Sequence, residues 1–244
     1  MLTTQPAPTT RSINGPALIE IILLGGTGAM LIRKATSGVL TFYIHPRYIP
    51  LVIVCGIALV ILAMARMRSI IHHPQASWRG QRLRYSLLAV PLLLGTFVPA
   101  RPLGAGALTN PLASLPGASL GGATITADTD TRAWNLLQWR TALSLLDEDL
   151  NGRPVDVVGF VYHDPGQNSD RFVVTRYVII CCAADRNGVG LPVQWSGGAG
   201  VPADSWVRVR GTLGSATPGD QTEPIVLATS VEPAPRPDQP YLYP

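Results

Sequence analysis

The chain has 244 residues, of which 47% are hydrophobic and only 14% are charged. A typical soluble domain carries about 25% charged residues, so this composition argues against an entirely soluble protein and places part of the chain in lipid. The first 100 residues hold nine lysines and arginines and one acidic residue, whereas the remainder holds ten basic and fourteen acidic residues. Because nucleic-acid binding requires a basic face, which the acidic second part lacks, we expect no nucleic-acid partner.

Three apolar runs follow a polar tail at residues 1–15, which we expect to be disordered. The runs predict a transmembrane domain at residues 16–100, with helices at about 16–32, 48–65 and 85–100. At 1.5 Å per residue each helix spans roughly 24–27 Å, close to the hydrocarbon thickness of about 30 Å. A cleaved signal peptide is an alternative for the first run, but Arg33 and Lys34 follow it where a small-residue cleavage site would be needed. Buried core helices are the other alternative, and the arginine-rich loops between the runs count against it.

Charge predicts the orientation of these helices. The segment between the second and third runs carries five arginines and no acidic residue, which favours a cytoplasmic location. The N-terminus is then cytoplasmic, and the 33–47 loop and everything after Ala100 lie outside. The three basic residues of the 33–47 loop weaken this prediction. We expect a multi-pass protein of the bacterial plasma membrane, in contact with the lipid bilayer, with an extracytoplasmic C-terminal domain.

A linker is expected at residues 101–130, which are rich in Gly, Ala, Pro, Ser and Leu. The next segment, residues 131–236, predicts a helix followed by a β domain. An amphipathic helix is expected from about Thr131 to Leu150, with Asp130 or Thr131 as its N-cap. Its apolar residues recur at helical spacing: Leu136, Trp139, Leu143 and Leu146.

Five short β-rich runs separated by turn sequences follow Gly152. The runs are residues 153–163, 171–183, 190–195, 205–214 and 223–233. Their number and spacing predict a small OB-like β-barrel, with Gly159 and Gly211 where the strands must bend, although a small sandwich fits the same pattern. A Pro-rich extended tail is expected at 237–244. The predicted fold class is membrane α + β: three N-terminal transmembrane helices, then an amphipathic helix and a five-stranded OB-like barrel domain.

The adjacent cysteines Cys181 and Cys182 are the main candidate site. On a strand their side chains would point to opposite faces, one inward and one outward. Three interpretations stay open: a buried small hydrophobe, a vicinal disulfide, or a metal or thiol-chemistry site. Thiolates suit zinc or another soft transition metal such as copper(I), but two cysteines are too few for a closed zinc site. His163 and Asp185 are the nearest additional ligands in the same domain.

Two charged residues are candidates for contact with a partner or a transport pathway. Glu20 is the only acidic residue of the first 100 residues. An ionisable residue at membrane depth often marks a pathway or a partner contact, but near a helix end its side chain can also extend to the interface. Arg176 is either a solvated strand-edge charge or pairs with Asp185 or Asp156 to orient the strand end.

Several stretches resemble a bacterial family of predicted permease subunits. They are YIHPRYIPLV at 43–52, VDVVGFVY at 155–162, RFVVTRYVIICCAAD at 171–185, WVRVRGTL at 206–213 and PYLYP at 240–244. Members combine a short membrane part with a C-terminal domain of unknown function and are encoded beside a larger polytopic permease. The resemblance, which covers about residues 16–244, implies an accessory subunit of a two-component transporter and suggests a link to transition-metal supply.

The leading hypothesis is therefore an integral membrane accessory subunit whose extracytoplasmic β domain binds a solute, a metal ion or the larger permease subunit. The membrane part is too small to form a pore alone. We expect no enzymatic activity, because no catalytic motif is found. The alternative is a membrane-anchored thiol or metal redox protein that uses Cys181 and Cys182.

Overall fold

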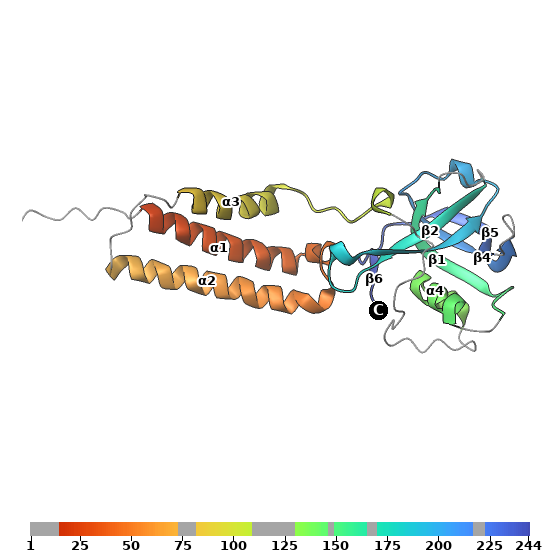
Figure 1. The fold of residues 1–244 in the computed structure, drawn as a ribbon, viewed down its shortest axis with the longest axis horizontal. Coiled ribbons are helices and arrows are strands. Elements are labelled where there is room, and N and C mark those ends of the chain that lie inside the picture. Colours follow the sequence, from red (N-terminus) through yellow and green to blue (C-terminus); the bar gives the residue numbers. More distant parts are fainter. Residues whose placement is uncertain (1–14, 73–81, 109–129, 146–148, 165–169, 217–222) are drawn as a thin grey trace, which may run out of the picture. The chain divides into compact units, whose positions relative to one another are not determined.

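The computed structural model describes residues 15–72, 82–108, 130–145, 149–164, 170–216 and 223–244 (Figure 1). Two compact units divide the chain. The helical unit comprises Met1–Leu40 and Pro46–Ala100, and the barrel unit comprises Thr41–His45 and Arg101–Pro244. The predicted N-terminal tail lies outside the described residues, apart from the start of the first helix, and so does most of the predicted linker.

The described residues of the helical unit form three α-helices: α1 (Gly15–Thr36), α2 (Ile49–His72) and α3 (Arg82–Phe97). Two helical stretches, Gly15–Thr36 and Pro46–Arg68, are long and apolar enough to cross a membrane, with mean hydropathies of 1.7 and 2.7. The apolar part of α3 runs only from Tyr85 to Phe97, since its first turn carries arginines. The structure thus supports two of the three predicted spans by length among the described residues, and α3 falls short.

Glycine allows α1 and α2 to pack closely. A Cβ atom built on Gly28 would lie 2.6 Å from the carbonyl oxygen of Gly56, and one on Gly56 would lie 3.0 Å from that of Gly28. The first distance is shorter than a Cβ atom tolerates and the second is at the limit, so the two backbones are in close contact at this crossing. Small residues at the contact are typical of helix packing in membranes, where van der Waals contact supplies much of the association energy.

The barrel unit contains a closed ring of five strands. They are β1 (Pro154–Tyr162), β2 (Arg171–Val178), β3 (Asn187–Gln194), β4 (Trp206–Ala216) and β5 (Glu223–Pro233). The ring runs β1-β2-β3-β5-β4 and closes between β4 and β1, with only the β3–β5 pair parallel. All five predicted strands are confirmed, and closure excludes the open sandwich. The strand order is consistent with an OB-like barrel.

Alternating apolar residues fill the interior of the barrel. Val155 and Val157 of β1 and Phe172 and Val174 of β2 join one buried cluster with Trp139 of α4 (Leu136–Leu145). The strand β4 bends at a register irregularity between Arg210 and Gly211, and a Cβ atom at Gly211 would collide with the carbonyl oxygen of Leu227. The predicted bend at this glycine is confirmed.

The helix before the barrel starts later than predicted. A short 3-10 turn occupies Thr131–Ala133, and α4 begins only at Leu136. The reason is a capping box: the Asn135 side chain accepts hydrogen bonds from the backbone N–H groups of Leu137 and Gln138, at 2.9 and 3.0 Å, and the Gln138 side chain accepts from Asn135 N–H at 2.8 Å. Asp130 caps only the 3-10 turn. The predicted apolar position Leu146 lies outside the described residues.

The start of the predicted linker belongs to the barrel unit. Residues 103–108 pack on a second buried cluster: Phe160, Tyr177, Ile179 and Tyr241. The Tyr177 hydroxyl donates to Gly104 O at 2.8 Å, and the Tyr241 hydroxyl accepts from Leu103 N–H at 2.8 Å. The prediction of a loose linker is therefore wrong for these residues, because their small apolar side chains cover the second cluster.

The predicted extended tail forms a sixth strand. β6 (Tyr241–Leu242) pairs in parallel with β2. The Arg176 guanidinium donates to the carbonyl oxygens of Pro240, at 3.1 Å, and of Gln239. The C-terminal residues are thus a structural part of the barrel unit.

Candidate functional site

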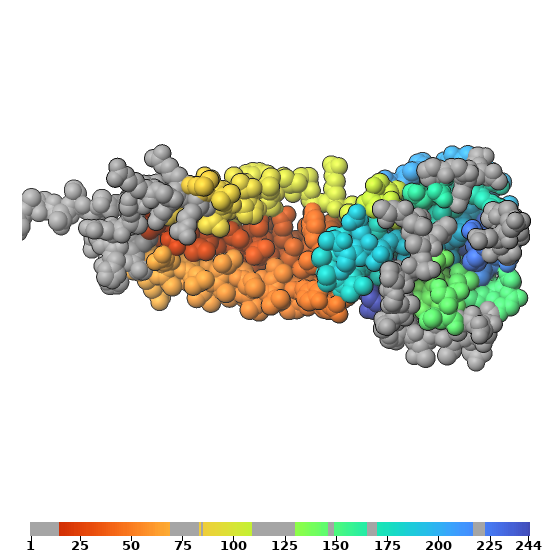
Figure 2. All heavy atoms as spheres, in the orientation of Figure 1, coloured from red at the N-terminus to blue at the C-terminus, as the bar shows by residue number. Residues whose placement is uncertain are grey.

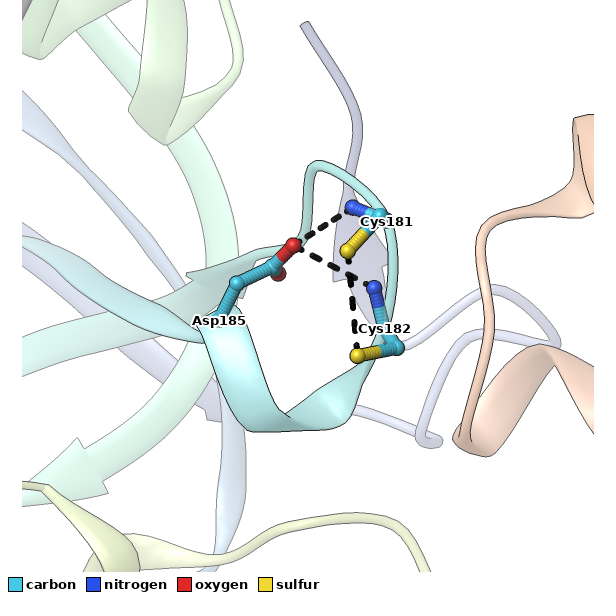
Figure 3. Close-up of side chains that lie close together, drawn as sticks. All are labelled: Cys181, Cys182 and Asp185. Atoms are coloured by element: carbon cyan, nitrogen blue, oxygen red, sulfur yellow. Dashed lines mark hydrogen bonds between the residues drawn. The ribbon is translucent and has the colours of Figure 1, made fainter.

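The two cysteines lie in a turn and not on a strand. β2 ends at Val178, and Cys181 and Cys182 precede a short 3-10 turn at Ala183–Asp185. The Asp185 carboxylate accepts hydrogen bonds from the backbone N–H groups of Ile180, Cys181 and Cys182, at 3.1, 2.6 and 3.3 Å. Figure 3 shows the bonds from Cys181 and Cys182. These three N–H groups are then unavailable to a sheet. The predicted strand ends early for this reason, and the predicted opposite orientation of the two thiols is wrong.

The turn brings three possible metal ligands together. The Sγ atoms of Cys181 and Cys182 are 3.8 Å apart, which is beyond the S–S bond length of about 2.05 Å, so both thiols are free. One donor atom each from Cys181, Cys182 and Asp185 lies within 4.8 Å of the others. Two sulfurs bound to one tetrahedral zinc at about 2.3 Å would be about 3.8 Å apart. The spacing of the thiols therefore fits a shared metal ion.

The site is open to solvent. Cys181 is exposed and Cys182 is partly exposed, so neither thiol is the buried small hydrophobe that was one of the three interpretations. The turn after β2, coloured cyan in Figure 2, contributes to the surface of the barrel unit. An ion or a partner group can reach the thiols without a rearrangement of the barrel.

The Asp185 carboxylate controls the charge of the site. Its hydrogen bond to the Cys181 side chain, with a second contribution from Cys182, raises the pKa of the Cys181 thiol to about 11. For Asp185 itself, partial burial works toward a higher pKa, but the hydrogen bonds from the Cys181 side chain and the three backbone N–H groups outweigh it and lower the pKa. At neutral pH the site therefore holds a carboxylate beside a protonated Cys181 thiol, a poor nucleophile.

We expect Cys181 to react slowly with iodoacetamide despite its exposure. The measurement uses a Cys55→Ser/Cys182→Ser variant, which keeps the larger contribution to the pKa of Cys181, that from Asp185. Alkylation of Cys181 at pH 8 should be at least about tenfold slower than that of free cysteine. Because only the thiolate reacts, the rate should continue to increase with pH to well above pH 9. Mass spectrometry of quenched samples gives the rate at each pH. Adding Asp185→Asn should speed the reaction, and a rate equal to that of free cysteine would contradict the assignment.

His163, the other predicted ligand, is not part of this donor group. Its Nε2 atom lies 2.8 Å from the carbonyl oxygen of Val201, and its ring packs against Phe172 at a centroid distance of 6.4 Å. The prediction grouped His163 with the cysteines only because they share a domain. His163 follows β1 and the cysteines follow β2, and the sequence does not show how far apart the ends of these two strands lie.

The candidate partner residues have partners within the chain. Glu20 of α1 forms an ion pair with Arg66 of α2 at 3.2 Å. Arg176 binds the C-terminal carbonyl groups, and its guanidinium lies 5.8 Å from the ring centroid of Trp206. The suggested pairing of Arg176 with Asp185 or Asp156 is not found, because C-terminal carbonyls occupy its guanidinium.

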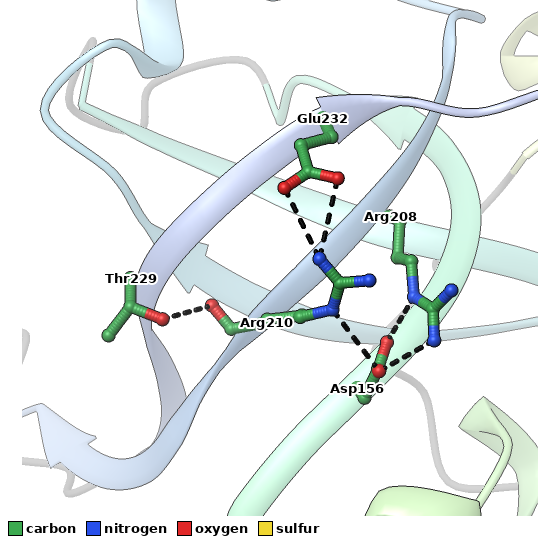
Figure 4. Close-up of polar contacts among 5 residues, drawn as sticks. All are labelled: Asp156, Arg208, Arg210, Thr229 and Glu232. Atoms are coloured by element: carbon green, nitrogen blue, oxygen red, sulfur yellow. Dashed lines mark hydrogen bonds and ion pairs between the residues drawn. The ribbon is translucent and has the colours of Figure 1, made fainter.

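Asp156 instead belongs to a surface ion network on the barrel (Figure 4). Arg208 and Arg210 of β4 contact its carboxylate at 2.6 and 3.3 Å, and Arg210 also pairs with Glu232 of β5 at 3.2 Å. The hydrogen bond from Arg208 is the main reason why the pKa of Asp156 is lowered. The network joins β1, β4 and β5, and its charges satisfy one another, which is typical of a structural role.

Sequence reasoning missed the segment that holds the cysteine turn. The connection between α1 and α2 pairs with the turn through an antiparallel bridge between Ile44 and Cys182. The backbone N–H of His45 donates to Cys181 O at 3.0 Å, and that of Ala183 donates to Tyr43 O at 2.8 Å. The available signal was the stretch at 43–52, which shares the family resemblance with the cysteine stretch.

The described residues thus combine an apolar helical unit, with two helices long enough to cross a membrane, and a closed five-stranded barrel that carries a thiol–carboxylate turn. The DUF1980 N-terminal domain matches residues 19–110, and the DUF1980 C-terminal domain matches residues 126–244. The chain belongs to the DUF1980 family.

Two curated relatives and one solved structure are similar to this chain. The UPF0703 protein YcgQ of Bacillus subtilis (strain 168) is 33% identical over 94 residues, a match that spans 38% of this chain and only 33% of YcgQ. A Streptococcus mutans serotype c (strain ATCC 700610 / UA159) protein named "Putative two-component membrane permease complex subunit" is 24% identical over 93% of this chain and 99% of its own length. A chain of a replication protein A heterotrimer bound to single-stranded DNA is 15% identical, over 36% of this chain and 60% of that chain, with a TM-score of 0.21, too low for any inference.

Proposed function

We propose that this protein is the accessory subunit of a two-component membrane permease. The observation that carries the proposal is the similarity to the Streptococcus mutans protein, which extends over 93% of this chain and 99% of that protein and so includes both units. The helical unit, with three α-helices in the described residues, is too small to enclose a pore. A larger polytopic subunit is therefore needed for transport, and the accessory subunit serves capture, gating or assembly.

Within this function we propose that the cysteine turn binds zinc or another soft transition metal. Cys181, Cys182 and Asp185 would hold the ion, which as a Lewis acid would compensate the negative charge of their deprotonated forms. The 3.8 Å spacing of the sulfurs and the exposure of Cys181 support this site. The raised pKa of Cys181 speaks against the alternative of a thiol-based redox protein, because such proteins rely on a lowered thiol pKa.

We further propose that the protein is multi-pass, with the barrel unit outside the cytoplasm. The connection Thr41–His45 belongs to the barrel unit, so it lies on the same side of the membrane as the barrel. If α1 and α2 both cross, the chain leaves α2 on the opposite side and must cross again before Arg101. The described helix in that interval is α3, and the residues 98–100 that follow it are also uncharged. A short helix can span by thinning the bilayer or by packing against a partner.

Glu20 stays a proposed contact for the larger subunit. Its ion pair with Arg66 leaves 32% of the Glu20 side chain exposed, and Arg66 is 58% exposed. The pair connects α1 and α2 and presents both charges at the surface of the helical unit. Arg176 is proposed to act through the barrel, by holding the C-terminal strand in place.

Purification from native membranes tests the proposed assembly. A chromosomally tagged chain, extracted in a mild detergent from the bacterium that carries it, should bring down a polytopic membrane protein in stoichiometric amount. A tagged, unrelated membrane protein of the same cell is the control. If the chain elutes as a single species without a second subunit after chemical cross-linking in intact cells, the accessory role is contradicted.

A further inference from the structure

The cysteine turn supplies three donor atoms where a closed zinc site uses four. Structural zinc sites are almost always tetrahedral, with thiolate, imidazole and carboxylate ligands. Among the described residues, the donor group comprises only Cys181, Cys182 and Asp185. Of the four histidines in the chain, only His45 and His163 belong to the barrel unit. One of these two is the natural source of a fourth ligand within the unit.

Backbone pairing places His45 next to the donor group. The Ile44–Cys182 pair is flanked by the hydrogen bonds His45 N–H to Cys181 O and Ala183 N–H to Tyr43 O. This pattern identifies Ile44 and Cys182 as a non-hydrogen-bonded antiparallel pair, in which the two Cα atoms are about 4.5 Å apart. His45 is therefore the direct neighbour of Cys181 across the pairing. Pro46 reinforces this arrangement, because a residue before proline favours an extended backbone.

The His45 ring lies against a tyrosine that the fold holds in place. Its centroid is 4.6 Å from that of Tyr243, at an interplanar angle of 64°. The Tyr243 hydroxyl donates to Thr41 O at 3.4 Å, which ties the tyrosine to the same connection. The ring nitrogens of His45 are not within the 4.8 Å donor group. A rotation of the His45 side chain away from its present contacts, the edge-to-face contact with Tyr243 among them, would be needed to bring a nitrogen to the ion.

The competing histidine is engaged elsewhere. His163 has its Nε2 atom 2.8 Å from Val201 O and its ring against Phe172, and it is not part of the donor group of Cys181, Cys182 and Asp185. Recruiting it would require a movement of the β1 end. Recruiting His45 starts from a backbone that is already hydrogen-bonded to Cys181.

We propose that His45 is the fourth ligand of the metal site, so that the ion joins the α1–α2 connection to the cysteine turn of the barrel. This inference rests on the proposed metal site. Cys181 and Cys182 come from the turn after β2, and His45 comes from the connection that precedes α2. Metal binding is thereby linked to the helix pair that would contact the larger permease subunit.

Metal binding by the full chain in detergent, with cobalt(II) as a spectroscopic stand-in for zinc, tests the proposal. The wild-type chain should bind one cobalt ion with the absorption of a tetrahedral site and with sulfur-to-cobalt charge-transfer bands. His45→Ala should keep the charge-transfer bands but bind zinc at least about tenfold more weakly, and X-ray absorption of the zinc form should lose its imidazole contribution. His163→Ala is the matched control and should behave like the wild type.

The outcomes separate this inference from the metal site itself. His45→Ala removes only a partly exposed side chain and leaves the backbone hydrogen bonds, and His45→Gln is a second variant that retains a polar side chain. If His45→Ala and His45→Gln match the wild type in affinity and in the imidazole signal, His45 is not a ligand, while the site of Cys181, Cys182 and Asp185 stands. If the wild-type chain binds neither zinc nor cobalt, both the metal site and the role of His45 are overturned.

Discussion

Replacement of Cys181 and Cys182 by serine should abolish the binding of one zinc ion per chain. The two thiols provide two of the three donors that lie within 4.8 Å of one another, and hydroxyl groups are poor ligands for soft metals. We expect the affinity for zinc to fall by at least about a hundredfold in the double variant, measured by competition with a fluorescent chelator. Because zinc displaces the proton of Cys181, whose pKa is raised to about 11, wild-type affinity should rise with pH across the neutral range.

Cys55→Ser provides the matched control for the double variant. Cys55 is an exposed cysteine of α2 without a disulfide bond, belongs to the helical unit and is not a member of the donor group. Its replacement should leave stoichiometry and affinity unchanged. Circular dichroism of all variants checks that the barrel is folded. Equal zinc binding by the folded double variant and the wild type would remove the proposed metal site.

A cysteine introduced at position 215 should be labelled by a membrane-impermeant maleimide in intact cells, whereas one at position 77 should be protected. Ser215 is an exposed residue of β4 in the barrel unit. Ser77 lies in the arginine-rich segment that we propose to be cytoplasmic, because positive charges favour that side of the membrane. The expected effect is all or none, because the barrel and this segment would be on opposite sides of the membrane.

The labelling uses a chain in which the three native cysteines are replaced by serine. A permeant maleimide should label both introduced cysteines and so shows that each is accessible. Labelling of Ser77→Cys together with protection of Ser215→Cys would reverse the orientation. Labelling of both positions, or of neither, by the impermeant reagent in intact cells would place them on one side and would mean that α3 does not cross.

Local sequence patterns predicted the strands of the barrel well, because the burial of a strand residue follows from its position in a short alternating pattern. Each strand alternates side chains between the interior and the surface, so an apolar residue at every second position, as at Val155 and Val157, identifies a buried face without knowledge of its partners. Turn-forming residues between the runs then separate the strands. The start of the helix was predicted less well. Asp130 and Asn135 are both residue types that cap helices, so the sequence offers two possible starting points.

The end of β2 shows the limit of this reasoning. An apolar run leads directly into Cys181, and nothing in its alternation signals a stop. The stop comes from Asp185, whose carboxylate binds three backbone N–H groups within five residues. An aspartate a few residues downstream is compatible with many conformations, so its capture of these groups was not evident from the sequence.

By itself, the sequence determined the division into an apolar helical part and a β domain, the positions of the five strands and the candidate thiols, since composition and periodicity act over a few residues. Only the tertiary structure decided that the tail forms β6, that residues 103–108 cover the second buried cluster, and that His45 lies beside Cys181. These contacts join residues that are far apart along the chain. They depend on which apolar surfaces are still exposed after the barrel has closed. The local sequence around one residue does not contain this information.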